Sequence, residues 1–228
     1  MTVNEMHIAF RLHLNKSTSL VGTPDFLPEE IDFWLNEAQE RFIKQRLFGN
    51  NYRKEEFEDS QKRIEDLRNL IVYSEDNALT PSLLGPNVKQ TDIPTIPPFN
   101  YLVRFMLNNG TGVRVNGFDV VRHSDAFKYI QDTINYPFIK RPVAVLEMGN
   151  FEVIYDPEYN PTRIDITYIK KPLVLTSFTP TTGVSTDTCE LTVETHSEIV
   201  VLAAELAIEN IESIRTQTFT PINSSKIE

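Results

Sequence analysis

Side chains capable of acid–base or nucleophilic chemistry occur throughout this chain of 228 residues, but their spacing matches no hydrolase motif. The contiguous triplet His123-Ser124-Asp125 has the three residue types of a serine hydrolase triad. Triad members come from separate segments, because neighbours on one strand or turn cannot point at one another in the required relay. We therefore interpret the triplet as a strand end followed by a helix that Ser124 caps.

Paired carboxylates are the second chemical possibility. A small hydrolase that uses Glu147, Glu152 and Asp156 is our alternative function. Glu147 and Glu152 flank a predicted two-residue hairpin turn at Gly149-Asn150. An exposed strand pair excludes water poorly, which disfavours catalysis there. The alternative loses its support if Glu147→Gln with Glu152→Gln leaves every assayed activity and particle assembly intact.

The sequence predicts no catalytic residue, cofactor or metal site. The four histidines, His7, His13, His123 and His196, form neither an HExxH motif nor a Cys/His cluster, and the chain has no glycine-rich phosphate loop. The single cysteine, Cys189, cannot form an internal disulfide, which fits a protein made in a reducing cytoplasm.

The chain is acidic, with 22 Lys and Arg against 32 Asp and Glu and a net charge of -10. Such a surface repels a phosphate backbone on average. The sequence also lacks a helix-turn-helix with a basic second helix, so our third hypothesis, a nucleic-acid-binding regulator, is disfavoured. Salt-sensitive binding of the isolated chain to duplex DNA would restore it.

Two compact basic pairs stand out against this acidic background, Lys140-Arg141 and Lys170-Lys171. Each lies beside a proline at a predicted strand end. They are either solvated strand termini or contacts for an acidic neighbouring subunit or a phosphate backbone. No segment has the roughly 20 apolar residues that a membrane-spanning helix needs, so we expect no membrane partner.

The pattern of residues 1–73 predicts three helices. Residues 3–15 place apolar side chains four apart on one stripe. Residues 27–48 have Pro28 at the first helical position and a buried face from Ile31 to Phe42. Residues 53–73 carry apolar side chains at near-heptad spacing among many charges, which predicts a third amphipathic helix.

The rest of the chain changes character several times. Five prolines and no sustained period predict an extended linker at 74–98. Alternation of apolar and polar residues predicts a small β-rich module at 99–175, and it is followed by a predicted loop at 176–194, a helix at 195–215 and a polar tail at 216–228. The predicted fold is α+β: an antiparallel helix bundle of three N-terminal helices and one C-terminal return helix, interrupted by a small β-rich insertion module, with an extended C-terminal tail.

The predicted return helix is apolar around more of its circumference than a single-faced surface helix requires. Thr195 and Glu198 have the spacing of a capping box at its start. We expect the stripe from Ile31 to Phe42 to cover one face. The first or third helix, or a neighbouring subunit, should cover the rest.

Three segments together resemble the head-to-tail connector proteins of tailed bacteriophages, especially the ring or adaptor proteins of crAss-like phages. They are NYPFIKRPVAVLEMGNFEVIY at 135–155, DITYIKKP at 165–172 and HSEIVVLAAELAIENIESIRTQTFTPIN at 196–223. Pro137, Phe138, Arg141 and Pro142 form the entry to a hairpin in the first segment. The short N-terminal helix followed by LPEEIDFWLNEAQERFIKQRL is similar to the first two helices of the same adaptors, whereas 74–98 lies outside the resemblance.

The resemblance implies a structural protein with no catalysis and no cofactor. Such proteins form a homo-oligomeric ring, usually twelve-fold, which docks under the portal protein, contacts adjacent ring or tail proteins and extends the DNA channel. DNA passes through without sequence-specific binding. The implied location is the neck or tail of the virion, after assembly in the host cytoplasm. Another tail or neck interaction module is the alternative within the same class.

The resemblance also implies that the C-terminal tail reaches the portal, which makes Gln217, Phe219, Pro221 and Ile222 candidate interface residues. A ring needs two different contact surfaces on each subunit, because its interface is heterologous and closes by rotation. The acidic average suits a channel along which DNA slides, since a basic lumen would hold DNA through counterion release. A lumen lined by Lys and Arg would contradict this hypothesis.

Overall fold

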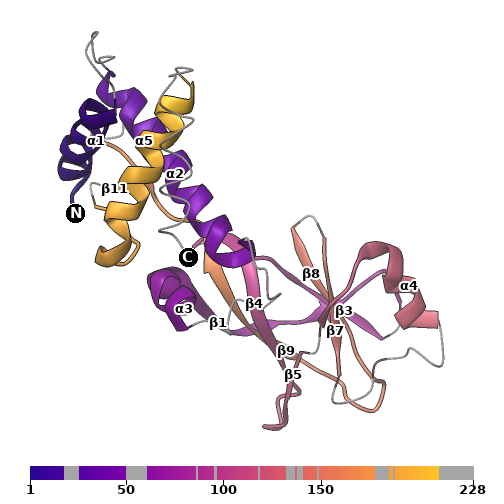
Figure 1. Ribbon diagram of the computed structural model, residues 1–228. Coiled ribbons are helices and arrows are strands. Elements are labelled where there is room, and N and C mark those ends of the chain that lie inside the picture. The colour runs from indigo at the N-terminus through magenta and orange to yellow at the C-terminus, as the bar shows by residue number, and fades with distance from the viewer. Residues whose placement is uncertain are drawn as a thin grey trace. The chain divides into compact units, whose positions relative to one another are not determined.

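The computed structural model describes residues 1–17, 26–49, 61–85, 87–94, 97–117, 119–131, 137, 141–147, 149–177, 185–186 and 188–210 (Figure 1). The chain forms two compact units. The helical unit comprises Met1–Leu70 and Pro172–Glu228, and the strand-rich unit comprises Ile71–Lys171. The strand-rich unit is therefore inserted into the sequence of the helical unit.

The helical unit contains four α-helices among the described residues. These are α1 (Val3–Ser17), α2 (Pro28–Phe48), α3 (Gln61–Leu67) and α5 (His196–Asn210). Two short 3-10 helices, η2 (Arg68–Leu70) and η3 (Val193–Thr195), and a parallel pair of two-residue strands, β10 (Val174–Leu175) and β11 (Ser185–Thr186), complete its described elements.

Helix α2 begins and ends at the residues that its sequence predicts. The Leu27 N–H donates to Glu30 Oε2 at 2.8 Å before the first turn. Pro28 then occupies a position whose N–H would have no helical partner. The helix ends at Phe48, and the Gly49 N–H donates to the Gln45 carbonyl.

Helix α5 packs against both α1 and α2, and Figure 1 shows it alongside them. The predicted return of this helix onto α2 is therefore confirmed, and α1 supplies a second contact. Ile199, Val200, Ala203, Ala204 and Ala207 are buried on α5. Because three of these are alanines, the helix backbones can approach closely in a densely packed core.

The strand-rich unit contains a four-stranded and a five-stranded sheet. The four-stranded sheet is antiparallel, in the order β1 (Ile71–Ala78), β9 (Arg163–Lys170), β4 (Phe99–Asn108) and β5 (Arg114–Asn116). The five-stranded sheet has the order β2 (Thr80–Pro81), β3 (Val88–Asp92), β8 (Asn150–Ile154), β7 (Val143–Leu146) and β6 (Asp119–Val120), and only β6 pairs in parallel.

One apolar core is shared by inward-facing residues of the two sheets. The Phe105 ring of β4 meets the Phe151 ring of β8 edge to face, with centroids 5.3 Å apart. Helix α4 (His123–Gln131) covers the opposite face of the five-stranded sheet, where Ala126 packs with Val143 and Ile154. The unit thus has three layers, and a strand surrounded on both faces, such as β8, is buried almost throughout.

The predicted fold class was right in being α+β but wrong in being a helix bundle with a small β insertion. Two sheets of four and five strands make the strand-rich unit a full domain with its own core. The stretch at 74–98 holds part of β1 and all of β2 and β3. Its prolines mark strand ends, because Pro81 sits on a two-residue edge strand and Pro94 follows β3.

The third predicted helix, 53–73, also differs from the structure. Its described part is helical only from Gln61, turns 3-10 at Arg68 and gives way to β1 at Ile71. Ile71, Val72 and Tyr73 are β-branched or aromatic and pair with β9, so the strand preference of these residues outweighs the heptad spacing.

Three local predictions shift by a residue or more. Glu147 and Asn150 exchange both backbone hydrogen bonds, so Asn150 belongs to the paired strands and not to the loop of the hairpin. Helix α4 begins at His123 rather than after Ser124. Thr195 lies in η3 and donates to the Thr192 carbonyl, so it forms no capping box with α5.

Candidate interaction surfaces

A buried cation joins three helices of the helical unit. Arg46 of α2 is 6% exposed, and its Nε lies 2.7 Å from Asp66 Oδ2 of α3. Its Nη2 lies 2.6 Å from Glu198 Oε2 of α5. The guanidinium also stacks over the Phe42 ring at 4.6 Å. Glu198 is therefore committed to Arg46, and the network orients helices from both ends of the sequence.

Helix α2 also binds an extended segment through a ladder of polar side chains. Asn36 pairs with both backbone groups of Leu175, as its Nδ2 donates to the carbonyl at 2.9 Å and its Oδ1 accepts from the N–H at 2.8 Å. Gln39 Nε2 donates to the Leu173 carbonyl at 3.2 Å. Side chains three or four residues apart on the helix thus contact every second residue of the extended segment. This is possible because three or four helical residues and two extended residues each advance by about 5 to 7 Å.

The ladder ends at Asp32, where a serine and a histidine approach one carboxylate. His7 Nε2 lies 2.7 Å from Asp32 Oδ1, while the Ser177 N–H and Oγ each donate to Oδ2 at 2.9 Å. In a catalytic triad the histidine lies between the serine and the acid. Here the acid lies between them, so the serine hydroxyl bonds to a carboxylate and not to a histidine, and the cluster is structural.

Two further reactive groups of this unit are held in unreactive forms. Burial raises the pKa of the Cys189 thiol to about 11, and its Sγ donates to Gln39 Oε1 at 3.3 Å. Burial lowers the pKa of His196, whose Nε2 lies 2.9 Å from the Leu191 carbonyl. A protonated thiol is a weak nucleophile, and a neutral ring bonded to backbone is not free to relay protons.

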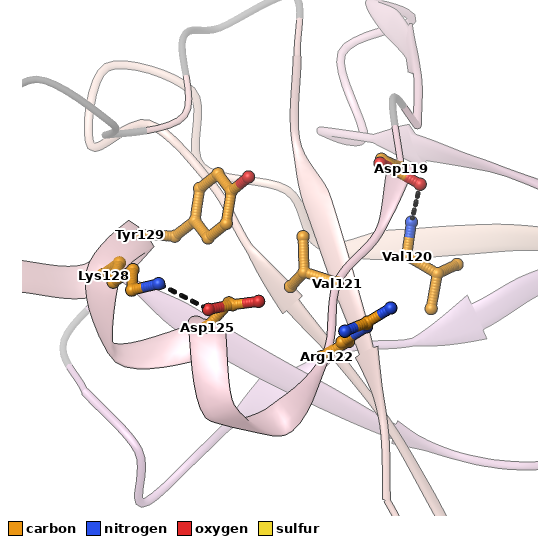
Figure 2. Close-up of a pocket in the computed structure, with 7 residues that line it drawn as sticks. All are labelled: Asp119, Val120, Val121, Arg122, Asp125, Lys128 and Tyr129. Carbon is orange, nitrogen blue, oxygen red and sulfur yellow. Dashed lines mark hydrogen bonds and ion pairs between the residues drawn. The ribbon is translucent and has the colours of Figure 1, made fainter.

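An open cavity of about 490 Å³ lies beside α4 in the strand-rich unit. Three of its four charged side chains are already bonded within the chain (Figure 2). Lys128 Nζ lies 2.6 Å from Asp125 Oδ1, which lowers the pKa of Asp125 and raises that of Lys128. Asp119 Oδ1 accepts from the Val120 N–H at 2.7 Å. The lining has equal positive and negative charge and contains no serine, cysteine or histidine.

The carboxylates of the alternative hydrolase each have a separate partner. Glu147 is half exposed beside His123, with Nδ1 and Oε1 3.6 Å apart. Glu152 is 3% exposed and accepts from Ser82 Oγ at 2.6 Å. Asp156 accepts from the Glu158 N–H in a turn. The described residues also contain no group of three or more His, Cys, Asp or Glu that could hold a metal ion.

The predicted interface residues are only partly described. Gln217, Phe219, Pro221, Ile222 and Lys140 lie outside the described residues. Arg141 is exposed just before β7, in the five-stranded sheet. At the end of β9, in the four-stranded sheet, Lys170 is half-buried and Lys171 is exposed, and the Lys171 N–H donates to the Pro98 carbonyl at 2.8 Å. The described members of the two basic pairs therefore sit on different sheets.

A first surface missed by the sequence analysis is the outer face of the four-stranded sheet, which we call the Arg104 face. It consists of Tyr73, Arg104, Met106, Arg114 and Asn116, whose strand partners place them opposite the shared core. Tyr73 is 41% exposed, and Arg104, Arg114 and Asn116 are exposed. Arg104 Nε donates to Thr167 Oγ1 at 3.2 Å, and neither arginine has an ion-pair partner among the described residues.

A carboxylate is buried beneath this face. Asp165 of β9 is 2% exposed and its Oδ1 accepts from the Asp76 N–H at 2.9 Å. Partial burial, followed by the negative charge of Asp165, raises the pKa of Tyr73. Asp76 adopts a left-handed conformation, with φ of 56°, in the bulge of edge strand β1. The bulge breaks the regular hydrogen-bond ladder of β1. The Arg104 face is therefore left exposed, while this edge of the sheet is protected against the addition of another strand.

A second missed surface is the solvent side of α2, which we call the Phe33 stripe. It consists of Glu29, Glu30, Phe33, Glu37 and Glu40, which recur at helical spacing opposite the buried face. Phe33 is 60% exposed and meets the Trp34 ring edge to face at 5.1 Å. Glu40 pairs loosely with Lys44 at 3.7 Å.

Sequence spacing alone contains a signal for the Phe33 stripe. On α2 the four glutamates and Phe33 follow the helical period beside the buried stripe from Ile31 to Phe42. The Arg104 face was harder to find, because Tyr73 was assigned to a helix and bulges interrupt the alternation of β4 at Val103. The side of each residue on a strand cannot be counted across a bulge.

Most of the interior polar groups described above form hydrogen bonds or ion pairs that stabilise the fold. The Phe33 stripe and the Arg104 face are exposed surfaces with aromatic and charged side chains. These are features of a structural assembly protein. The chain belongs to the phage tail ring protein 3/4 family of crAss-like phages, whose model matches residues 1–218. It is therefore a structural protein of the phage virion, located in the tail, and of a kind that assembles into rings with other tail proteins. The match also includes 74–98, which the resemblance left out.

No curated protein matches the sequence. Within the described parts of the chain, no helix has the length and apolar character needed to cross a bilayer.

Proposed function

We propose that this protein is the subunit of a head-to-tail connector ring that docks under the portal and extends the DNA channel toward the tail. The observation that carries the proposal is the family match over residues 1–218. By resemblance to other connectors, the ring has twelve subunits and occupies the neck of the virion, after assembly in the host cytoplasm. The ring contacts the portal and an adjacent ring or tail protein.

The proposed role requires no catalysis. The described nucleophiles and acids support this, because Ser177 bonds to Asp32 rather than to a histidine, Cys189 is held as a thiol and Glu147 and Glu152 have separate partners. The net charge of -10 supports a channel that lets DNA slide without sequence-specific binding. The hydrolase alternative has no comparable support.

Within this proposal the tail, residues 216–228, holds the portal. Phe219 and Ile222 are apolar residues in a polar stretch, which suits anchors that enter pockets on a partner. Gln217 and Pro221 lie between them in the same contact. The basic pairs Lys140-Arg141 and Lys170-Lys171 are proposed contacts for acidic surfaces of neighbouring subunits.

The experiment is a binding assay between the full chain and purified portal, followed by electron microscopy of the complex. We expect a ring on one face of the portal. Deletion of 216–228 should abolish binding and leave the unfolding midpoint unchanged, whereas Ser224→Ala with Ser225→Ala should bind like the wild type. Undiminished portal binding by the truncated chain would contradict the proposed role of the tail, and no binding by the wild type would contradict portal docking.

A further inference from the structure

We propose that neighbouring copies of this chain contact each other by packing the Phe33 stripe of one copy on the Arg104 face of the next. The inference rests on the proposed ring. A ring joins two different surfaces of each subunit. The two surfaces lie on different units of the chain, the stripe on the helical unit and the face on the strand-rich unit.

Charge is the first argument for this pairing. Four glutamates surround Phe33, and two arginines without ion-pair partners among the described residues stand on the Arg104 face. In a chain of net charge -10, an exposed pair of unpaired arginines is most readily matched by an acidic surface of another copy. Glu29 and Glu37 likewise have no ion-pair partner among the described residues.

Acidic groups near the arginines limit this attraction but do not cancel it. Asp165 lies beneath the face, where Asp76 N–H already bonds its Oδ1. Asp76 is itself paired with Arg163 at 2.9 Å. Glu75 is exposed in the bulge of β1, near Tyr73. The two charges that project from β4 and β5 on this face remain Arg104 and Arg114.

Geometry is the second argument. The stripe from Glu29 to Glu40 is about 16 Å long at 1.5 Å per residue. A four-stranded sheet is about 14 Å wide between its outer strands. Arg114 lies opposite Asn108, four residues along β4 from Arg104, so the two arginines lie about 14 Å apart at the backbone, and Glu29 and Glu37 lie about 12 Å apart on the helix. Long side chains on both surfaces can therefore meet without rearrangement of either backbone.

Aromatic groups supply the apolar centre of the contact. Phe33 would lie between Tyr73 and Met106, inside the ring of charges, and Trp34 already supports it from behind. Exposed aromatic side chains surrounded by polar groups are the usual anchors of protein interfaces. Methionine sulfur beside an aromatic ring adds further attraction.

The test reverses the charge of each surface in the full chain. Arg104→Glu with Arg114→Glu, or Glu29→Lys with Glu37→Lys, should each raise the self-association constant Kd by about tenfold or more, measured by sedimentation velocity at low salt. The chain carrying all four substitutions should associate like the wild type, and an equimolar mixture of the two double variants should also recover. Arg68→Glu with Arg122→Glu is the matched control, since both arginines are exposed and lie on neither surface.

Failure of the four-fold variant to recover, or normal association of either double variant, would overturn the pairing. The pairing would also be overturned if Arg104→Glu with Arg114→Glu removed salt-sensitive binding to duplex DNA and left self-association unchanged. The Arg104 face would then be a DNA-binding surface.

A second measurement applies if the wild-type chain stays monomeric in solution. Glu37→Cys with Arg104→Cys, in a Cys189→Ala background, is incorporated into phage particles and oxidised. We expect a ladder of disulfide-linked multimers on a non-reducing gel, and no ladder when Arg122→Cys replaces Arg104→Cys. Incorporation without a ladder would contradict this interface alone, whereas absence of the chain from particles would contradict the proposed connector function.

Discussion

Arg46 joins three helices of the helical unit. It is buried between Asp66 and Glu198, so Arg46→Ala would leave the Asp66 carboxylate without its partner in the interior. We expect a loss of about 3 to 5 kcal/mol in the free energy of unfolding, measured by urea denaturation. The control is Arg68→Ala, which breaks the exposed pair with Glu65 and should cost less than about 0.5 kcal/mol. Equal effects of the two substitutions would show that the Arg46 network is not structural.

His196 makes the stability of the helical unit depend on pH. Burial holds its pKa below the usual value of 6.5, so the unfolded chain binds this proton more readily than the folded chain does. The stabilisation is complete above the unfolded pKa and is lost as the pH falls below it toward the folded pKa. We expect the unfolding free energy to fall between about pH 7.5 and 5.5, and His196→Gln to reduce that slope. An unchanged slope in His196→Gln would contradict the assignment.

Few roles of individual side chains can be predicted from local sequence. His123, Ser124 and Asp125 are consecutive on α4, where neighbouring side chains do not face one another. Glu198 was assigned to a cap by local spacing, yet it binds Arg46, which is 152 positions away. Local spacing is visible in a sequence, whereas partners brought together by packing are not.

Among the elements, the segment of Leu173 to Ser177 depends on side chains of α2 rather than on a wide sheet. Asn36 bonds both backbone groups of Leu175, so Asn36→Ala would leave a donor and an acceptor without partners. We expect a loss of about 1 to 3 kcal/mol and faster hydrogen exchange at 173–177, with little change in α5. Glu37→Ala, one position along the helix and exposed, is the control. Unchanged exchange at 173–177 in Asn36→Ala would show that other contacts hold the segment.

The elements that the sequence predicts well are those with a long period and clear ends. Helices α1, α2 and α5 have both a long period and clear ends, and α5 returns to pack on α2 as predicted. The segment at 74–98 was predicted as a linker because five prolines interrupt it. Proline is compatible with edge strands and strand ends, and the pairing partners of β1 and β3 are β9 and β8, far along the chain. Pairing over such distances leaves little local signal.

In the whole molecule, the two units should be separable. The strand-rich unit begins at Ile71, which pairs with Ile169, so its two ends lie on neighbouring strands. A domain with its own core and adjacent ends can fold alone. We therefore expect a fragment of residues 71–171 to unfold cooperatively in urea and to give a dispersed amide NMR spectrum. A fragment that shows neither property would mean that its core requires the helical unit.

The number of subunits and the channel cannot be derived from one chain, because they depend on surfaces that become complementary only between copies. The composition indicates an acidic protein without a catalytic motif, and the family match makes it a tail ring protein. The portal contact, the symmetry and the lining of the channel are therefore tested on the assembled particle.

The most direct test of the connector proposal is a cryo-electron microscopy reconstruction of the virion neck that assigns this chain by its side chains. We predict a closed ring of twelve copies beneath the portal, with residues 216–228 in contact with it and acidic side chains facing the DNA channel. A position away from the portal, or a channel lined by Lys and Arg, would contradict the account.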